Sequence, residues 1–226
     1  MRALVTGSNG GIGSALVARL RADGLEVVTL DVTDPADIVL DLESDDVPEL
    51  SDIDVCVSNA GLTTILSPAH RMSRAKWERD LAVNLSGAFR VVQACLGGMR
   101  DRGFGRIVVI SSMAGRFGGP GQVAYSASKA GLVGMVKTVA AENVGHGITA
   151  NAVLPGMIGT PAALAMPEDV VARIAPRLMP MGRMGTPEEV AALVAFLASC
   201  DAAYVTGQAI GIDGGAELNT ASLGSA

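Results

Sequence analysis

The sequence predicts an α/β protein built on a doubly wound parallel sheet of about seven strands, with helices on both faces. Short aliphatic runs alternate with helical patterns along the chain, and this alternation is typical of a parallel sheet. The chain has 226 residues, and 49% of them are hydrophobic, which is enough for one sizeable core. Because the chain has no linker-like segment and no internal repeat, we expect a single domain over residues 1–226.

The expected strands are short runs of β-branched and aliphatic residues, bounded by polar or glycine-rich turns. They lie at residues 3–5, 26–30, 37–40, 53–57, 107–110, 148–153 and 209–212. Helical patterns occupy residues 14–23, 77–100, 122–144 and 187–199, the last with proline in its first turn. The remaining long connections are an acidic, solvated one at residues 43–52 and a Met-, Pro- and Ala-rich excursion at 156–186, with one short helix near 168–178.

A glycine-rich turn from Thr6 to Gly13 joins the first strand to the first helix. Glycines let the backbone approach a pyrophosphate, and a helix N-terminus presents N–H groups and a positive dipole end. Strand, glycine turn and helix in this order are the context that a dinucleotide site requires. Asp31 follows the second strand, where a ribose-binding acid is expected. The alternative is a glycine turn that binds no ligand.

A second candidate site is the pair Tyr125 and Lys129, which lie four residues apart on an expected helix and therefore on one face. A free phenol has a pKa of about 10, and a nearby ammonium group favours the phenolate and lowers that pKa. A tyrosine tuned in this way can exchange a proton with an alcohol near neutral pH. The alternative is a tyrosine that only packs on the stem of the lysine.

Several residues with site chemistry follow the expected strands directly or nearly so. They are Gly7, Asp31, Asn59, Ser112 and Pro155. The carboxyl ends of parallel strands meet at one edge of the sheet, and ligands bind at that edge. We therefore expect these five residues to lie around one site.

Composition argues against several other classes of protein. The net charge is -6 and no basic stripe is visible, so nucleic acid is not an expected partner. No run of 18 apolar residues predicts a membrane-spanning helix, and the first residues lack the hydrophobic region of a signal peptide.

Cys56, Cys95 and Cys200 lack metal-type spacing and suit buried thiols in a reducing cytoplasm. His70 and His146 match no motif, and we expect both at the surface.

The ordered set of motifs resembles that of the short-chain dehydrogenase/reductases, in their compact single-domain group with a Rossmann-like fold. The resemblance covers nearly the whole chain, and the set is far more specific than any one motif. It rests on Thr6-Gly7-x-x-x-Gly11-Ile12-Gly13, Asn59-Ala60-Gly61, Asn84, Ser112, Tyr125-x-x-x-Lys129 and Pro155-Gly156.

The resemblance implies hydride transfer between NAD and a secondary alcohol or ketone. Tyr125 would be the acid/base, and Lys129 would bind the nicotinamide ribose and lower the pKa of the tyrosine. Ser112 would hydrogen-bond the substrate oxygen, and Asn84 would hold a water in the proton path. The implied cofactor contacts are Gly7, Asn9, Gly11, Ile12, Gly13, Asp31, Asp41, Leu42, Asn59, Ala60, Gly61, Tyr125, Lys129, Pro155, Gly156, Ile158 and Thr160.

Four of these residues also have plain structural alternatives. Ser112 could cap a strand end, and Asn84 could bond backbone within its own helix. Thr160 could be an N-cap before Pro161, and Asp41 could be an ordinary turn carboxylate.

Asp31 predicts NAD rather than NADP, because a carboxylate repels the extra 2′-phosphate. Gly10 and Val32 stand where NADP-using relatives often carry a cationic residue. The chain departs from the family pattern at Ser58, where a second Asn is usual. The link between Asp31 and Asp37 is also short, so we expect a more open adenine pocket on that side.

The expected substrate pocket is mostly apolar and favours a small or hydrophobic ketone or alcohol. Its expected lining is Met113, Phe117, Gln122, Val123 and residues 157–181. A 3-oxoacyl-thioester (acyl-carrier-protein) reductase is the enzymatic alternative. A non-catalytic cofactor-binding protein is the other, but it would be expected to lack Tyr125 or Lys129, and a dehalogenase-like relative has Arg for the lysine. The resemblance also implies a homotetramer that pairs the Tyr125 helix with the helix at 81–100.

Overall fold

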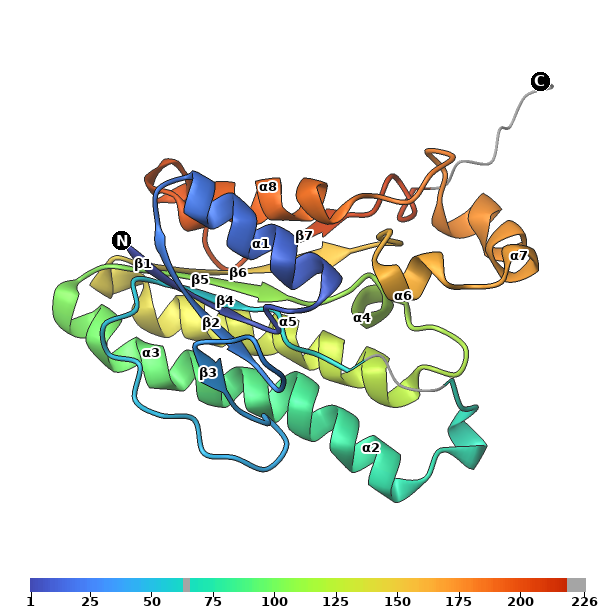
Figure 1. The fold of residues 1–226 in the computed structure, drawn as a ribbon, viewed down its shortest axis with the longest axis horizontal. Coiled ribbons are helices and arrows are strands. Elements are labelled where there is room, and N and C mark those ends of the chain that lie inside the picture. Colours follow the sequence, from blue (N-terminus) through green and yellow to red (C-terminus); the bar gives the residue numbers. More distant parts are fainter. Residues whose placement is uncertain (63–65, 219–226) are drawn as a thin grey trace.

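The computed structural model describes residues 1–62 and 66–218. Their seven strands form one parallel sheet in the order β3-β2-β1-β4-β5-β6-β7 (Figure 1). This arrangement confirms the predicted doubly wound sheet. The strands are β1 (Arg2–Thr6), β2 (Glu26–Asp31), β3 (Ile38–Val39), β4 (Val55–Ser58), β5 (Gly105–Ile110), β6 (Ile148–Pro155) and β7 (Ala209–Ile212).

Helices cover both faces of this sheet. In Figure 1, α1 (Gly11–Ala22) and α8 (Pro187–Ala198) pack together on one face, while α3 (Ala88–Arg102) and α5 (Val123–Asn143) cover the other. The shorter helical segments are η1 (Ala69–Arg71), α2 (Arg74–Leu81), η2 (Ala82–Gly87), α4 (Ala114–Phe117), η3 (Val144–His146), α6 (Pro161–Leu164), α7 (Glu168–Leu178) and η4 (Cys200–Ala202).

Each face of the sheet has its own apolar core. Leu16 of α1 and Val194 of α8 pack on one face, and Met99 of α3 and Leu132 of α5 pack on the other. All residues of β4, β5 and β6 are buried, as expected for central parallel strands that are covered on both sides. The covered core holds the carboxyl ends of these strands in fixed positions, and those ends carry the site.

The helix expected over residues 77–100 extends further at both ends, from Arg74 to Arg102, and includes the π-helical segment η2. Ser73 caps its start by accepting a hydrogen bond from the Lys76 N–H, and Gly103 ends it in the left-handed conformation. A π-helical turn contains an extra residue, and such turns are frequent at functional sites. In this protein, η2 carries Asn84.

Two connections differ from what the sequence predicts. The segment at 43–52 is more than a solvated link, because the Leu50 side chain is buried and its N–H donates to the Ala94 carbonyl at 3.3 Å. The excursion at 156–186 contains α6 as well as the expected α7, because Thr160 and Pro161 together form a helix start.

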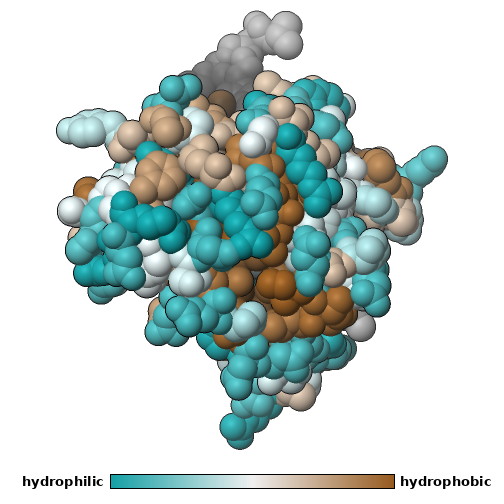
Figure 2. Space-filling model, turned by 60° about the vertical axis from the view of Figure 1, so that its left-hand side comes forward, coloured by the Kyte–Doolittle hydropathy of each residue, from teal (hydrophilic) through white to brown (hydrophobic). Residues whose placement is uncertain are grey.

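The expectation of three buried thiols is wrong for one cysteine. Cys56 and Cys95 are buried, whereas Cys200 is exposed at the start of η4. His70 and His146 are both exposed, as expected. Within the described part of the chain, no helix is both long and apolar enough to cross a bilayer. The face seen in Figure 2 is largely hydrophilic, with an apolar area between the polar residues.

Candidate active site

The structure brings the five predicted strand-end residues to one edge of the sheet. Asp31 is the last residue of β2 and Pro155 the last of β6, while Gly7, Asn59 and Ser112 follow β1, β4 and β5. Since all seven strands are parallel, these carboxyl ends face the same way. This edge is where a doubly wound sheet binds its ligands.

The glycine turn is a backbone cradle with no room for a side chain at Gly7 or Gly13. Gly7 has a φ of +64°, and a Cβ on it would lie 2.8 Å from Cα of Ala60. A Cβ on Gly13 would overlap the Gly7 carbonyl oxygen and lie 2.9 Å from Cα of Ser8. The Ser8 hydroxyl is buried and has no hydrogen-bond partner among the described residues. A pyrophosphate held by backbone N–H groups and this hydroxyl fits such a cradle.

Helix α1 begins at Gly11, three residues earlier than the sequence predicts. Its first turn therefore belongs to the glycine motif itself, and the unpaired N–H groups of that turn lie at the cradle. No acidic side chain occupies this first turn. The N-terminus is thus suited to an anion, because no carboxylate of its own neutralises the helix dipole there.

Asp31 is 9% exposed and is anchored by its neighbours. Its Oδ2 accepts a hydrogen bond from the Asn9 N–H at 2.9 Å, and Oδ1 accepts from the N–H and Oγ1 of Thr33 at 3.2 and 3.1 Å. A carboxylate has about four acceptor positions, so one remains for a ribose hydroxyl. The side chain of Asn9 donates to the Thr33 carbonyl at 2.8 Å, which ties the glycine turn to the end of β2.

The segment Asn59-Ala60-Gly61 joins β4 to the glycine turn. The Asn59 amide donates to the carbonyls of Thr6 and Gly7 at 3.0 and 3.1 Å. The Thr6 hydroxyl accepts from the N–H groups of Asn59 and Ala60, both at 3.0 Å. These bonds fix the wall beside the cradle, and the glycine motif does not reveal this role of Thr6.

Asn84, in η2, is fully buried. It holds the backbone of Leu62, the residue that follows the Asn59-Ala60-Gly61 segment. Its Oδ1 accepts from the Leu62 N–H at 2.6 Å, and its Nδ2 donates to the Leu62 carbonyl and to Oγ of Ser128 at 3.1 and 3.3 Å. A Cβ on Gly61 would lie 3.2 Å from both Asn84 Oδ1 and Lys129 Nζ, so these two groups converge there. Asn84 therefore bonds across the site and not within its own helix.

Tyr125 and Lys129 lie together on α5, with Lys129 Nζ 5.8 Å from the centre of the tyrosine ring. Lys129 is 4% exposed and donates to the Ile110 carbonyl at 2.8 Å. Burial disfavours its charged form and lowers the pKa of Lys129 to about 8. The sequence predicted neither this burial nor the contact with the end of β5.

The pKa of Tyr125 is raised, which is opposite to the shift that the sequence predicts. Burial is the main cause, because it removes water from the phenolate, and a hydrogen bond with Ser112 opposes it. The expected lowering by Lys129 assumed a full cation beside a solvated phenol. In the structure Lys129 is buried and Tyr125 is partly buried, and the loss of water around the phenol dominates.

Ser112 makes a capping contact at the end of its strand, which was its structural alternative, and it also lies at its predicted place beside Tyr125. Its Oγ accepts from the Ala114 N–H at 3.1 Å, so the hydroxyl is tied to the first residue of α4. The same hydroxyl lies close enough to the phenol to lower the pKa of Tyr125. The hydroxyl therefore stands between α4 and the phenol.

Thr160 and Asp41 also make structural contacts, Thr160 as an N-cap and Asp41 as a turn carboxylate. Thr160 caps α6 by accepting from the Ala163 N–H at 3.3 Å, and Asp41 Oδ1 accepts from the Glu43 N–H at 2.8 Å. Thr160 nevertheless borders the cradle, because a Cβ on Gly11 would lie 3.0 Å from its Cβ. The closeness of Thr160 to the glycine cradle, and not a polar contact there, links it to a cofactor site.

Three other predicted cofactor residues have structural contacts of their own. Leu42 is buried and its carbonyl accepts from Arg90, while buried Ile158 forms a bridge with Gly185. The Gly156 N–H donates to the Ile212 carbonyl at 3.0 Å.

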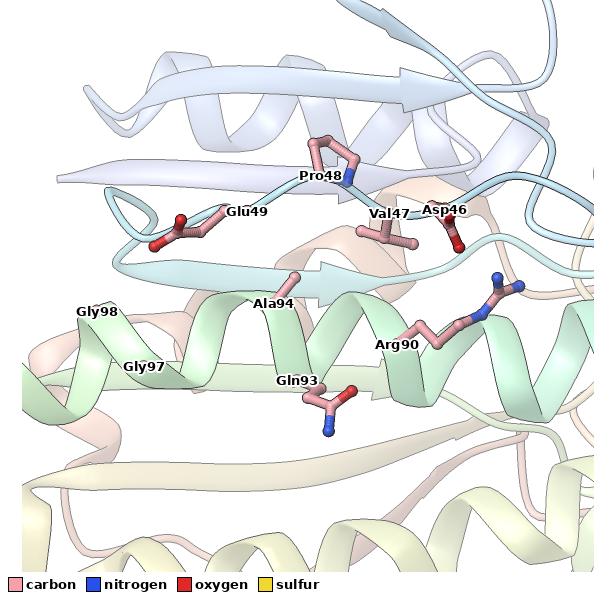
Figure 3. Close-up of a pocket in the computed structure, with 9 residues that line it drawn as sticks. All are labelled: Asp46, Val47, Pro48, Glu49, Arg90, Gln93, Ala94, Gly97 and Gly98. Carbon is pink, nitrogen blue, oxygen red and sulfur yellow. The ribbon is translucent and has the colours of Figure 1, made fainter.

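Two hollows in the structure are separate from this edge. One, of about 510 Å³, lies between residues 46–49 and α3 (Figure 3). A second, of about 330 Å³, includes Arg2 and Glu26, which are the first residues of β1 and β2 and therefore lie away from the carboxyl edge. Neither hollow is lined by a predicted site residue. No group of three or more His, Cys, Asp or Glu side chains suited to a metal occurs in residues 1–62 and 66–218.

A doubly wound parallel sheet with a glycine cradle, a buried lysine and a partly buried tyrosine at its carboxyl edge defines a dinucleotide-dependent oxidoreductase. The family described as "Enoyl-(Acyl carrier protein) reductase" matches residues 12–217. The chain is 41% identical to an acetoacetyl-CoA reductase of Rhizobium meliloti, with 94% of this chain and 97% of the relative covered. It is 39% identical to a 3-oxoacyl-(acyl-carrier-protein) reductase of Thermotoga maritima, with 94% and 96% covered.

A solved structure from Beutenbergia cavernae, provisionally named an NAD(P)-dependent gluconate 5-dehydrogenase, superposes with a TM-score of 0.90. It is 34% identical, covers 96% of this chain and 97% of its own, and contains NADP at low occupancy. The chain therefore belongs to the short-chain dehydrogenase/reductase family. It is an oxidoreductase that acts on hydroxyl or keto groups with a nicotinamide dinucleotide.

Proposed function

We propose that the chain transfers a hydride between NAD(H) and a secondary alcohol or ketone, through Ser112, Tyr125, Lys129 and Asn84. The convergence of these four side chains beside the glycine cradle is the observation that carries the proposal. A non-catalytic cofactor-binding protein would need neither the buried lysine nor the phenol. When bound, the nicotinamide supplies the hydride, and the protein supplies orientation and proton transfer.

Each side chain has a distinct part in this reaction. The Tyr125 hydroxyl gives its proton to the substrate oxygen during reduction and recovers it during oxidation. Ser112 donates a hydrogen bond to the same oxygen. Lys129 binds the nicotinamide ribose, and Asn84 holds a water on the path that returns a proton to the site. The raised pKa of Tyr125 keeps it protonated in the ligand-free protein, which suits a proton donor.

We assign NAD as the preferred cofactor because Asp31 is held rigidly at the ribose position. Its three hydrogen bonds to Asn9 and Thr33 oppose rotation away from a 2′-phosphate. Two like charges about 4 Å apart repel by about 4 kcal/mol at an effective dielectric constant of 20, which corresponds to about 10³-fold in affinity. Solvent reduces this limit. The NADP in the Beutenbergia structure makes cofactor choice a sharp test of this assignment.

We expect kcat/KM for NAD to exceed that for NADP by at least about tenfold. This ratio is smaller than the Coulomb limit because salt and solvent screen the repulsion between Asp31 and the 2′-phosphate. Asp31→Ser should narrow this ratio, mainly by weakening NAD. Steady-state kinetics with both cofactors measure the ratio in the wild-type and variant proteins. A wild-type preference for NADP, or an unchanged ratio in Asp31→Ser, would show that Asp31 does not read the ribose.

The relatives favour a particular substrate class, the 3-oxoacyl thioesters. Both curated relatives described above are named for reduction of such compounds. We propose acetoacetyl-CoA as the first substrate to assay, beside simple ketones, diols and steroids, with NADH and NADPH in parallel. Turnover of acetoacetyl-CoA well above that of the simple ketones would support the thioester class. Comparable turnover of a simple secondary alcohol would place the chain among general alcohol dehydrogenases.

We also propose a homotetramer, in which α3 and α5 pair across a two-fold axis. Exposed Phe89 on α3 and exposed Ala130 and Gly134 on α5 support this, because small residues allow close approach of a second helix. Exposed Phe196 on α8 and exposed Tyr204, which precedes β7 in the chain, support a second interface. Light scattering should give four times the chain mass, and a monomer at working concentration would contradict the proposal. We further propose a cytoplasmic location, which suits the three free thiols.

A further inference from the structure

Residues 213–218, which follow β7, form a short strap that reaches three parts of the site. Asp213 lies against the Pro155–Gly156 turn, since a Cβ on Gly156 would be 2.8 Å from its Cα. Gly214 lies beside Met181, within the excursion after β6. Glu217 forms an ion pair with Arg116 of α4, across 101 residues of sequence. No motif in the sequence indicates this pair.

Several contacts hold α4 beside the active-site residues. A Cβ on Gly115 would lie 2.7 Å from the backbone carbon of Lys129, so α4 packs directly on α5. The Met113 N–H donates to the Pro155 carbonyl at 3.0 Å. Arg116 anchors the other side of α4, because it donates to the Ala209 carbonyl at 3.0 Å and pairs with Glu217.

The hydroxyl of Ser112 depends on the placement of α4. Its Oγ accepts from the N–H of Ala114, the first residue of α4, and the same hydroxyl lowers the pKa of Tyr125. A shift of α4 away from α5 would therefore change the distance between Ser112 and the phenol. The backbone of Glu217 is held within the strap, because Asp213 Oδ2 accepts from the Glu217 N–H at 2.8 Å.

We propose that Glu217, through its ion pair with Arg116, is a positioning residue that holds α4 and thereby Ser112 against Tyr125. This inference rests on the proposed function, in which Ser112 and Tyr125 act on the substrate oxygen. Arg116 and Glu217 do not touch the reacting atoms. Their part is to keep the first turn of α4 in register with α5.

The first test is Glu217→Gln, which removes the charge but keeps the shape. Because both side chains are partly exposed, we expect kcat/KM for the carbonyl substrate to fall about two- to fivefold. The Kd for NADH should stay within about twofold, since the polar contacts of Glu217 are with Arg116 and Asp213 and not with the glycine cradle. High salt should reduce the difference between variant and wild type, because it screens the wild-type ion pair. Asp23→Asn, which breaks the exposed Arg19–Asp23 pair at the end of α1, is the matched control.

The pH profile separates positioning from general loss of stability. The hydrogen bond with Ser112 lowers the pKa of Tyr125, so a displaced serine lets that pKa rise. Alcohol oxidation needs the deprotonated phenol, and its rise with pH should therefore move upward by about 0.5 pH unit in Glu217→Gln. The charge-swapped double variant Arg116→Glu/Glu217→Arg should recover at least half of the loss caused by Arg116→Glu alone.

A Glu217→Gln protein with wild-type kcat/KM and pH profile would overturn the proposal. So would equal losses of substrate turnover, NADH binding and melting temperature, since these indicate a general structural role. Failure of the proposed function looks different. In that case Tyr125→Phe keeps its activity, whatever Glu217→Gln does.

Discussion

Tyr125→Phe should lose about 10²- to 10⁴-fold in kcat while its Kd for NADH changes by no more than about twofold. The ring and its packing on α5 remain, and only the proton donor is removed. Steady-state kinetics and a fluorescence titration with NADH measure the two quantities on the same preparation. Full activity in this variant would refute the assignment of Tyr125 as the acid/base.

Lys129→Ala is the companion variant, and it should behave differently. Lys129 Nζ donates to the Ile110 carbonyl and converges with Asn84 at Gly61, so its removal disturbs the ribose site as well as the proton path. Both turnover and cofactor binding should therefore fall. A loss confined to turnover would indicate that the lysine does not bind the ribose.

Gly13→Ala should weaken NADH binding by about 10²-fold and lower the free energy of unfolding by about 1–3 kcal/mol. The added Cβ would overlap the Gly7 carbonyl oxygen, so the cradle must move away from α1. Hydrogen bonds to charged groups contribute about 1.5–3 kcal/mol each, and loss of one or two accounts for the weaker binding. Titration with NADH and urea unfolding measure the two effects.

Gly10→Ala is the matched control for this substitution. Gly10 has a φ of -72°, which any residue adopts, and a Cβ on it would meet only the Gly7 carbonyl oxygen, at 3.4 Å. We expect its unfolding free energy to stay within about 0.5 kcal/mol of wild type. Equal losses in Gly10→Ala and Gly13→Ala would mean that general loop flexibility, rather than the close approach at Gly13, explains the effect.

Features that depend on local order were predictable from the sequence. The alternation of strands and helices predicts the parallel sheet, and the turn from Thr6 to Gly13 predicts the cradle, because each needs only residues that are close along the chain. The shared face of Tyr125 and Lys129 follows from helix geometry alone. The bounds of α7 were also predicted, whereas α1 begins earlier because helical N–H groups reach into the glycine motif itself.

Features that depend on burial or on distant partners were not predictable. The pKa of Tyr125 moves upward because the folded chain removes most of the water around the phenol, and the sequence shows the neighbouring lysine but not this loss of water. The π-helical turn at Asn84 satisfies contacts with Leu62 and Ser128, which come from other parts of the chain. Arg116 and Glu217 belong to no motif, so only the folded chain brings them together.

Transfer of deuterium follows the hydride from the cofactor to the substrate. NADH carrying deuterium at both C4 positions is incubated with the accepted ketone or 3-oxoacyl thioester, and mass spectrometry determines the label in the product. We expect one deuterium at the new carbinol carbon with the wild-type protein, and at least about 100-fold slower formation of that product with Tyr125→Phe. An alcohol without deuterium, or labelled product from Tyr125→Phe at the wild-type rate, would contradict the proposed mechanism.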